Sequence, residues 1–326
     1  MRKKHFNFHS VFASEIQSFL KLRTAQGHVI CYEAHILETL DIFLAEHGLW
    51  ERNLPAETID SWLYPFPKKL NANTLVTYVS YYVQFAKYMR ILDIPAFIPE
   101  SPKGNNEYVP YIFSEDEMKR LFAACDNLPV KKHNTKAQVI LPVLIRMLYG
   151  CGLRLDEALT LRLKDVDLIN GILHILNAKG SKDRIAPMHH SLTDICRNYY
   201  KLLHSTSEDT TYFFESRNHK RFPQIWARHW FGIALKSAGI ALPDGTKVSR
   251  GICPHCLRHT FAVDSFRKME RKGCNLYESI PFLSTYMGHS DLYGTEKYLR
   301  MTSEMHSDVV DRMAVYTSHV FPEVSE

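Results

Sequence analysis

The apolar residues of this 326-residue chain repeat at helical spacing along most of its length, but they change to a strand period within 165–188. In that segment Asn170-Gly171 separates two short apolar runs, and this dipeptide is a strong signal for a two-residue hairpin turn. A second turn at 179–182 precedes the returning run 184–187. The pattern predicts a mainly α fold that carries one small, three-stranded antiparallel β-sheet.

A turn-rich segment divides the chain into two parts. Residues 98–112 are rich in proline, glycine and asparagine and poor in apolar side chains, which is typical of a linker between domains. The part before it, 1–97, carries four helical patterns and no clear strand. The part after it, 113–326, opens with Ser114 and Glu117 at the spacing of a helix capping box. We therefore predict a four-helix domain, a linker and a larger α+β domain.

The composition describes a globular protein. Hydrophobic residues make up 45% of the chain, so it can form a core. The net charge of +5 is compatible with a polyanionic partner but does not establish one. No stretch approaches the roughly 18 apolar residues of a membrane span, and the N-terminal residues lack the apolar run of a signal peptide. The seven cysteines are scattered, so we expect reduced thiols and a soluble, cytoplasmic protein.

Cys253 and Cys256 have the C-x-x-C spacing of some redox and zinc sites. A redox pair of this kind normally opens a helix after a strand in a thioredoxin-like unit, and the surrounding residues favour a different reading. A zinc site needs further ligands at suitable spacing, and no second C-x-x-C pair exists. We predict no metal site and keep a redox function as a minor alternative.

Several polar residues of the last third could together hold a phosphate and attack it. His255 and Arg258 are three residues apart, so they share a helix face. A guanidinium group matches two phosphate oxygens, and His289, which follows Gly288, can donate a hydrogen bond to the same phosphate. Tyr298 offers a hydroxyl nucleophile. A neutral phenol is a weak nucleophile, so it needs a base and electrostatic help.

Two further candidates come from the middle of the chain. Arg154 follows a glycine turn at the start of a short helical pattern, and Glu157 lies on the same face, where it can orient the guanidinium. Lys179 lies at the tip of the second predicted turn. Each of these features is common alone, so the prediction depends on their combination in one chain. His259, next to Arg258, is interpreted as structural.

Taken together, these segments resemble the tyrosine recombinases, also called the phage integrase family. Residues 152–159 are similar to the first arginine box of the family, and 178–187 to its β-hairpin lysine motif. Residues 255–262 are similar to its His-x-x-Arg box. Residues 287–298 are similar to its closing box, in which Tyr298 follows His289 by nine residues.

The resemblance implies a mechanism. Tyr298 would attack a DNA phosphodiester, form a 3′-phosphotyrosine bond and release a 5′-hydroxyl. Arg154 and Arg258 would clamp the phosphate oxygens, and His289 would donate a further hydrogen bond. A 5′-hydroxyl of a second strand would then reverse the reaction. The phosphotyrosine bond conserves the bond energy, so the resemblance implies neither ATP nor a metal, and no cofactor.

The remaining roles and the partners are also implied by the resemblance. Lys179 would protonate the leaving 5′-oxygen, His255 would act as general base, and Glu157 would support Arg154. The helical domain 1–97 would be a core-binding (SAM-like) DNA-binding domain, and 113–326 the catalytic domain. The partner would be a specific double-stranded DNA site, bound by a homo-tetramer on two duplexes. An accessory or sister recombinase remains open, as does docking of the C-terminal tail in cis or in trans.

Other functions are compatible with the same residues. A type IB topoisomerase uses related chemistry, and relaxation of plasmids without strand exchange would indicate it. A non-catalytic DNA-binding factor would form no covalent adduct. The chain shows no clear extra domain before the four helices, which favours a simple recombinase or the enzyme of a mobile genetic element. The sequence does not distinguish integration, transposition, inversion and dimer resolution, nor does it name the DNA site.

Overall fold

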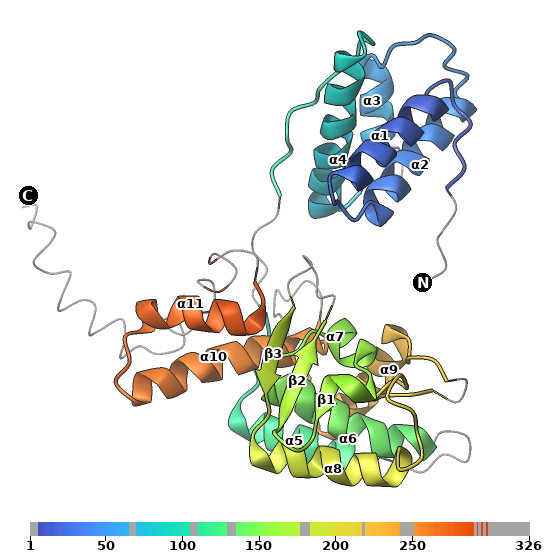
Figure 1. Ribbon diagram of the computed structural model, residues 1–326. Helices are drawn as coiled ribbons and strands as arrows, with labels where there is room; N and C mark the ends of the chain where they lie inside the picture. The colour runs from blue at the N-terminus through green and yellow to red at the C-terminus, as the bar shows by residue number, and fades with distance from the viewer. Residues whose placement is uncertain are drawn as a thin grey trace, which may run out of the picture. The chain divides into compact units, whose positions relative to one another are not determined.

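The chain forms two compact units, Met1–Glu107 and Tyr108–Glu326, and the division falls within the predicted linker 98–112. Each unit has its own apolar core. The computed structural model (Figure 1) describes residues 6–64, 70–104, 110–128, 135–176, 183–216, 219–241 and 251–289, together with Leu292, Thr295 and Tyr298.

Four helices form the described part of the first unit. Helix α4 begins after Asn71, whose side chain accepts a hydrogen bond from the backbone N–H of Asn73 at 3.0 Å, as the sequence predicts for a helix cap. The aromatic residues of α4 point inward, and Tyr82 and Phe85 are fully buried. The helices are α1 (Ala13–Ala25), α2 (Cys31–Glu46), α3 (Ala56–Leu63) and α4 (Ala72–Ile91).

A buried carboxylate attaches the segment before α1 to the rest of the first unit. Asp41 lies on α2 and accepts hydrogen bonds from the backbone N–H groups of His9 and Ser10, at 2.6 and 3.0 Å. It also accepts the Ser10 hydroxyl at 2.5 Å. These bonds attach the segment before α1 to the middle of α2, and they satisfy a carboxylate that is fully buried.

The second unit is mainly helical. Its first helix begins with the predicted capping box: the Ser114 hydroxyl accepts from the Glu117 N–H at 3.2 Å, and the Glu117 carboxylate accepts from the Ser114 N–H at 2.8 Å. A 3-10 turn, Leu163–Asp165, precedes the sheet. The helices of the described residues are α5 (Glu115–Asp126), α6 (Thr135–Gly150), α7 (Leu155–Thr160), α8 (His190–Leu203), α9 (Gln224–Ser237), α10 (His255–Arg271) and α11 (Leu276–Met287).

The predicted three-stranded antiparallel sheet is confirmed. It consists of β1 (Val166–Asp167), β2 (Ile172–Ile175) and β3 (Arg184–Pro187), in the order β1-β2-β3. The predicted length of the first turn is wrong: four residues, 168–171, join β1 to β2, and the Asp167 carboxylate accepts from the backbone N–H groups of Ile169 and Asn170, both at 2.9 Å. Gly171 takes the left-handed conformation, with a φ of +68°. The turn between β2 and β3, which includes Lys179, lies outside the described residues.

Helix α6 lies at the centre of the second unit and contacts α5, α8, α9 and α10 (Figure 1). Because neighbours surround it, its side chains are apolar on several faces rather than one. A second apolar cluster joins α10 to α11 and includes Tyr298. This packing brings the end of α6, the start of α10 and the end of α11 to one place. Within the described residues, no helix has the length and apolar character that a membrane span needs.

Candidate active site

Arg258 is the most deeply buried arginine of the site. It lies on α10, is 1% exposed, and donates hydrogen bonds to the carbonyl oxygens of Gly152 and Met287 at 2.5 and 2.6 Å. Those carbonyls belong to the α6–α7 turn and to the end of α11. Burial and the neighbouring charge of Arg154 lower the pKa of Arg258 to about 10, so the guanidinium stays charged at neutral pH.

Two glycines next to the site lie where a side chain would collide with its neighbours. Gly152 has a φ of +59°, and a Cβ atom there would lie 2.8 Å from Cε1 of Phe261. Gly288 caps α11 in the left-handed conformation, and a Cβ atom there would lie 3.1 Å from Cδ of Arg184. A larger residue at either position would be strained and crowded. The glycine turn before Arg154 therefore has a packing reason.

Glu157 binds two arginines at once. Its carboxylate accepts from the Arg154 backbone N–H at 2.8 Å and from the Arg154 guanidinium at 2.7 Å. It also accepts two bonds from Arg184, at 3.0 and 2.8 Å. Burial alone would raise the pKa of Glu157, but the hydrogen bonds and charge of Arg184, and the bonds from Arg154, lower it to about 2. Glu157 is therefore a permanent anion between two cations.

Arg184 is a site residue that sequence reasoning missed. It lies at the start of β3, and its Nε also donates to the carbonyl oxygen of Tyr286 at 2.9 Å. Its position in the lysine-hairpin segment was visible, but no helix or strand period connects it to Glu157, which is 27 residues away. Arg154 donates to the carbonyl oxygen of Gly288 at 3.1 Å, so both arginines also bind the end of α11.

Tyr298 lies in the apolar cluster and is 5% exposed. Its hydroxyl is 2.8 Å from Nδ1 of His259. Burial raises the pKa of the Tyr298 phenol, although the charges of Arg258 and Arg154 act in the opposite direction. The phenol is therefore protonated at neutral pH, and the direct partner of its hydroxyl is a residue that the sequence argument had interpreted as structural.

The other two imidazoles lie close by. His255 and His259 meet edge to face, with ring centroids 4.5 Å apart. The His289 and Tyr298 rings are stacked, with their centroids 6.2 Å apart. Nδ1 of His289 lies 2.6 Å from the Thr295 hydroxyl. Loss of hydration, together with the charges of Arg258 and Arg154, lowers the pKa of His255 to about 4. His255 is therefore a neutral imidazole at pH 7.

The structure thus brings six of the seven candidates predicted from the sequence to one site. Lys179, the seventh, lies outside the described residues. Two cations, a bridging carboxylate, two imidazoles and a phenol suit an enzyme that binds an anionic ester and attacks it. The six residues are Arg154, Glu157, His255, Arg258, His289 and Tyr298.

Sequence comparison places the chain in a known class. Residues 112–305 match the sequence profile of the phage integrase family. The chain therefore belongs to the phage integrase family of tyrosine recombinases.

Individual relatives agree over most of the chain. The tyrosine recombinase XerC of Chlorobaculum parvum is 27% identical over 313 residues, which cover 90% of this chain and 84% of XerC. The integrase/recombinase y4rB of Sinorhizobium fredii is 26% identical over 314 residues, covering 93% and 97% of the two chains. The crystal structure of the XerH site-specific recombinase bound to its difH substrate superposes with a TM-score of 0.61 at 18% identity, covering 86% and 79%. At that identity the likeness shows the fold alone.

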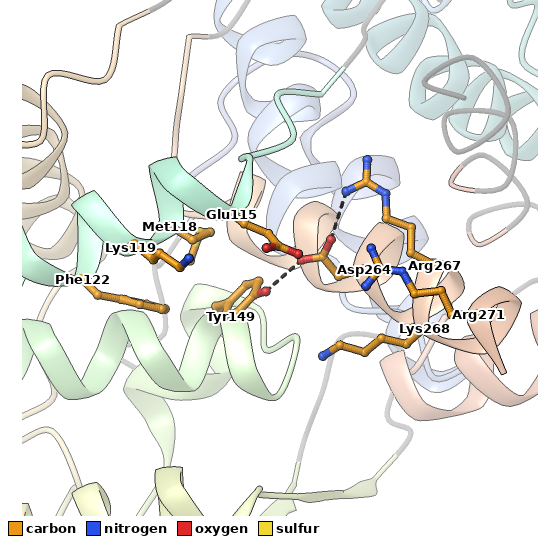
Figure 2. A pocket seen from close by; sticks show the side chains of 9 residues that line it. All are labelled: Glu115, Met118, Lys119, Phe122, Tyr149, Asp264, Arg267, Lys268 and Arg271. Atoms are coloured by element: carbon orange, nitrogen blue, oxygen red, sulfur yellow. Dashed lines mark hydrogen bonds and ion pairs between the residues drawn. The ribbon is translucent and has the colours of Figure 1, made fainter. Parts of the chain in front are cut away.

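A separate cavity of about 520 Å³ opens between α5, α6 and α10 (Figure 2). Within it Asp264 accepts a hydrogen bond from the Tyr149 hydroxyl at 2.8 Å and one from Arg267 at 3.2 Å. The cavity shares no residue with the candidate active site. Its lining residues are Glu115, Met118, Lys119, Phe122, Tyr149, Asp264, Arg267, Lys268 and Arg271.

The two thiols of the C-x-x-C pair lie at the start of α10. The Sγ atoms of Cys253 and Cys256 are 4.0 Å apart, and both thiols are free. Cys256 is fully buried in the core of the second unit. Among the described residues, no group of three or more histidine, cysteine or acidic side chains could hold a metal ion.

Proposed function

We propose that this chain is a site-specific DNA recombinase or integrase that cleaves and rejoins strands through a 3′-phosphotyrosine bond to Tyr298. The observation that carries the proposal is that Arg154 and Arg258 both donate to carbonyl oxygens at the end of α11, and that Met287 of this helix end shares an apolar cluster with Tyr298. A phosphodiester anion bound between these arginines would lie next to the nucleophile. Family membership and the DNA substrate of the XerH relative support the same substrate class.

The arginines are arranged to act on a phosphate. Each guanidinium has five N–H donors, and the bonds to protein groups leave others for a ligand. Glu157 fixes the direction of Arg154, and two backbone carbonyls fix that of Arg258. In the proposed reaction, the tyrosine oxygen bonds to phosphorus as the bond to the 5′-oxygen breaks. The fixed donors stabilise the extra negative charge of the pentacoordinate transition state.

The proton transfers complete the proposal. His255 takes the proton of Tyr298, Lys179 protonates the leaving 5′-oxygen, and His289 donates a hydrogen bond to the phosphate. Without DNA, the pKa of His255 is about 4, which is too low for an efficient base. A bound phosphate anion would offset the charges of Arg258 and Arg154 and raise that pKa. The base would therefore become effective only when substrate is present.

The wider assignment follows from the same proposal. The partner is a specific double-stranded DNA site, the active species is a homo-tetramer on two duplexes, and the biological setting is a mobile genetic element. The first unit would contribute to DNA binding as a core-binding domain. The phosphotyrosine bond conserves the energy of the cleaved ester, so the proposed reaction consumes no ATP.

The test uses DNA that flanks the gene, cut into nicked duplexes. Each duplex is mixed with the wild-type protein or with Tyr298→Phe and is run on a denaturing gel. A slow, protease-sensitive band with the wild type only would support the proposal and locate the site. An adduct that survives Tyr298→Phe would exclude Tyr298 as the nucleophile.

Two outcomes would favour other functions. Relaxation of supercoiled plasmid without strand exchange would indicate a topoisomerase-like enzyme. Specific binding without an adduct on any duplex, including one that carries the bound site, would indicate a DNA-binding factor.

A further inference from the structure

We propose that His259 is a positioning residue that holds the Tyr298 hydroxyl at the phosphate-binding arginines. The inference rests on the proposed function, in which Tyr298 is the nucleophile, and it gives a role to a residue that lies outside the predicted catalytic set. It is carried by the 2.8 Å contact between Nδ1 of His259 and the Tyr298 hydroxyl.

The surroundings of Tyr298 orient it from two sides. The ring lies in an apolar cluster that includes Ala262, Val263 and Phe266 of α10. These residues follow His259 by three, four and seven positions, so all four lie on one face of the helix. The apolar part of this face holds the ring, and His259 holds the hydroxyl. Helix α10 therefore contributes both to the apolar cluster around the ring and to the hydrogen bond of the hydroxyl, and α11 completes the cluster.

The contact does not make His259 the base. Burial and the charges of His255 and Arg258 lower the pKa of His259 to about 3, whereas the pKa of Tyr298 is raised above its ordinary value of 10.0. His259 is therefore a weak base, and the proton stays on the phenol oxygen. The hydrogen bond orients a neutral phenol, and removal of the proton is left to another group.

The far side of the His259 ring supports this assignment. Its Nε2 is buried and has no hydrogen-bond partner among the described residues. Within the part of the chain that the structure describes, the hydrogen bond of this ring is the one between Nδ1 and the Tyr298 hydroxyl.

The test compares His259→Leu with His259→Asn. Leucine removes the hydrogen bond, whereas the asparagine amide can reach approximately the place of Nδ1. We expect adduct formation on a nicked duplex to fall by roughly 10–100-fold in His259→Leu, because small misplacements of reacting groups have effects of this size. Most of the rate should return in His259→Asn. His190→Asn, at an exposed histidine of α8, is the matched control and should match the wild type.

Two further readouts separate positioning from other roles. The pH dependence of adduct formation should keep its shape in His259→Asn, whereas loss of its acid limb would make His259 the base. In ¹⁵N spectra of the full chain, Tyr298→Phe should shift the His259 Nδ1 resonance, which His259→Asn identifies. If the wild type forms no adduct, the proposed function fails, and the spectra still decide on the contact. An unshifted resonance, or equal rates in the leucine variant and the wild type, would overturn the inference.

Discussion

Asp41 in the first unit and Glu157 in the second are both buried carboxylates, but different kinds of partner satisfy them. Asp41 in the first unit accepts three hydrogen bonds, all from neutral groups of His9 and Ser10. Glu157 in the second unit accepts most of its bonds from the cations Arg154 and Arg184. Both side chains are buried, and both are satisfied.

The difference has a physical reason. A carboxylate that attaches a chain segment to its unit needs only hydrogen-bond donors, and neutral backbone N–H groups can supply them. A site that must present cations to a phosphate has to keep those cations in place before the phosphate arrives. A buried anion does this, since its charge offsets theirs and its two oxygens fix their directions. Asp41 thus stabilises a fold, whereas Glu157 also prepares a site.

The largest effect is expected from Glu157→Gln. The amide keeps the shape but leaves Arg154 and Arg184 without their counter-ion, so we expect a loss of about 3–5 kcal/mol in the stability of the second unit. Adduct formation should be lost as well, because Arg154 is no longer oriented. Hydrogen–deuterium exchange in increasing urea, followed on peptides from each unit, measures the first effect. A loss below about 1 kcal/mol would contradict the role of the bridging anion.

Asp41→Asn should have a smaller and separate effect. The amide can still accept one or two of the three bonds, so we expect a loss of about 1–3 kcal/mol in the first unit. The same exchange experiment should show faster exchange in peptides of α1 and α2, with peptides of the second unit unchanged. Adduct formation by an enzyme with an intact second unit should persist. Loss of stability in both units would contradict the division.

The second unit should also become less stable as the pH falls, because folding disfavours protonation of His259. Its pKa is about 3 in the folded chain and 6.5 ordinarily, so the unfolded chain takes up a proton first as the pH falls. Stability is therefore full above about pH 6.5 and falls toward pH 3, by at most roughly 1.4 kcal/mol for each pH unit. Urea unfolding of the wild type and His259→Asn at pH 7, 6 and 5 measures this. Equal slopes for both proteins would show that His259 is not the cause.

The smallest effect is expected from Asp156→Asn, directly beside Glu157 in the sequence. Asp156 is exposed and accepts bonds from Arg221 and Gln224, at 2.7 and 3.0 Å. Water and salt screen such a pair, so the loss should be about 0–1 kcal/mol and should vanish in high salt. Urea unfolding at two salt concentrations tests this. A loss that matches that of Glu157→Gln would mean that burial does not decide the effect.

Much of the fold was predictable because it depends on short-range rules. The capping box of Ser114 and Glu117 and the cap at Asn71 each involve residues within three positions of one another. The hairpin was predicted in the right place but with a turn of two residues instead of four, because the dipeptide Asn170-Gly171 does not reveal that the Asp167 carboxylate caps a longer turn. The change from helical to strand period is likewise local, and it predicts the small sheet correctly. The contact of Arg154 with Glu157 follows from helix geometry for the same reason.

Several contacts of the candidate site join residues that are far apart in the sequence. Arg258 and Gly152 are 106 residues apart, and His259 and Tyr298 are 39 apart. No period connects such residues. The sequence by itself determined most of the elements that form and which side chains are candidates for the chemistry, because these depend on local geometry and residue type. Only the tertiary structure decided that Arg184 shares the carboxylate of Glu157 and that His259 meets Tyr298, because these contacts depend on how separate elements pack, β3 on α11 and α10 on α11 among them.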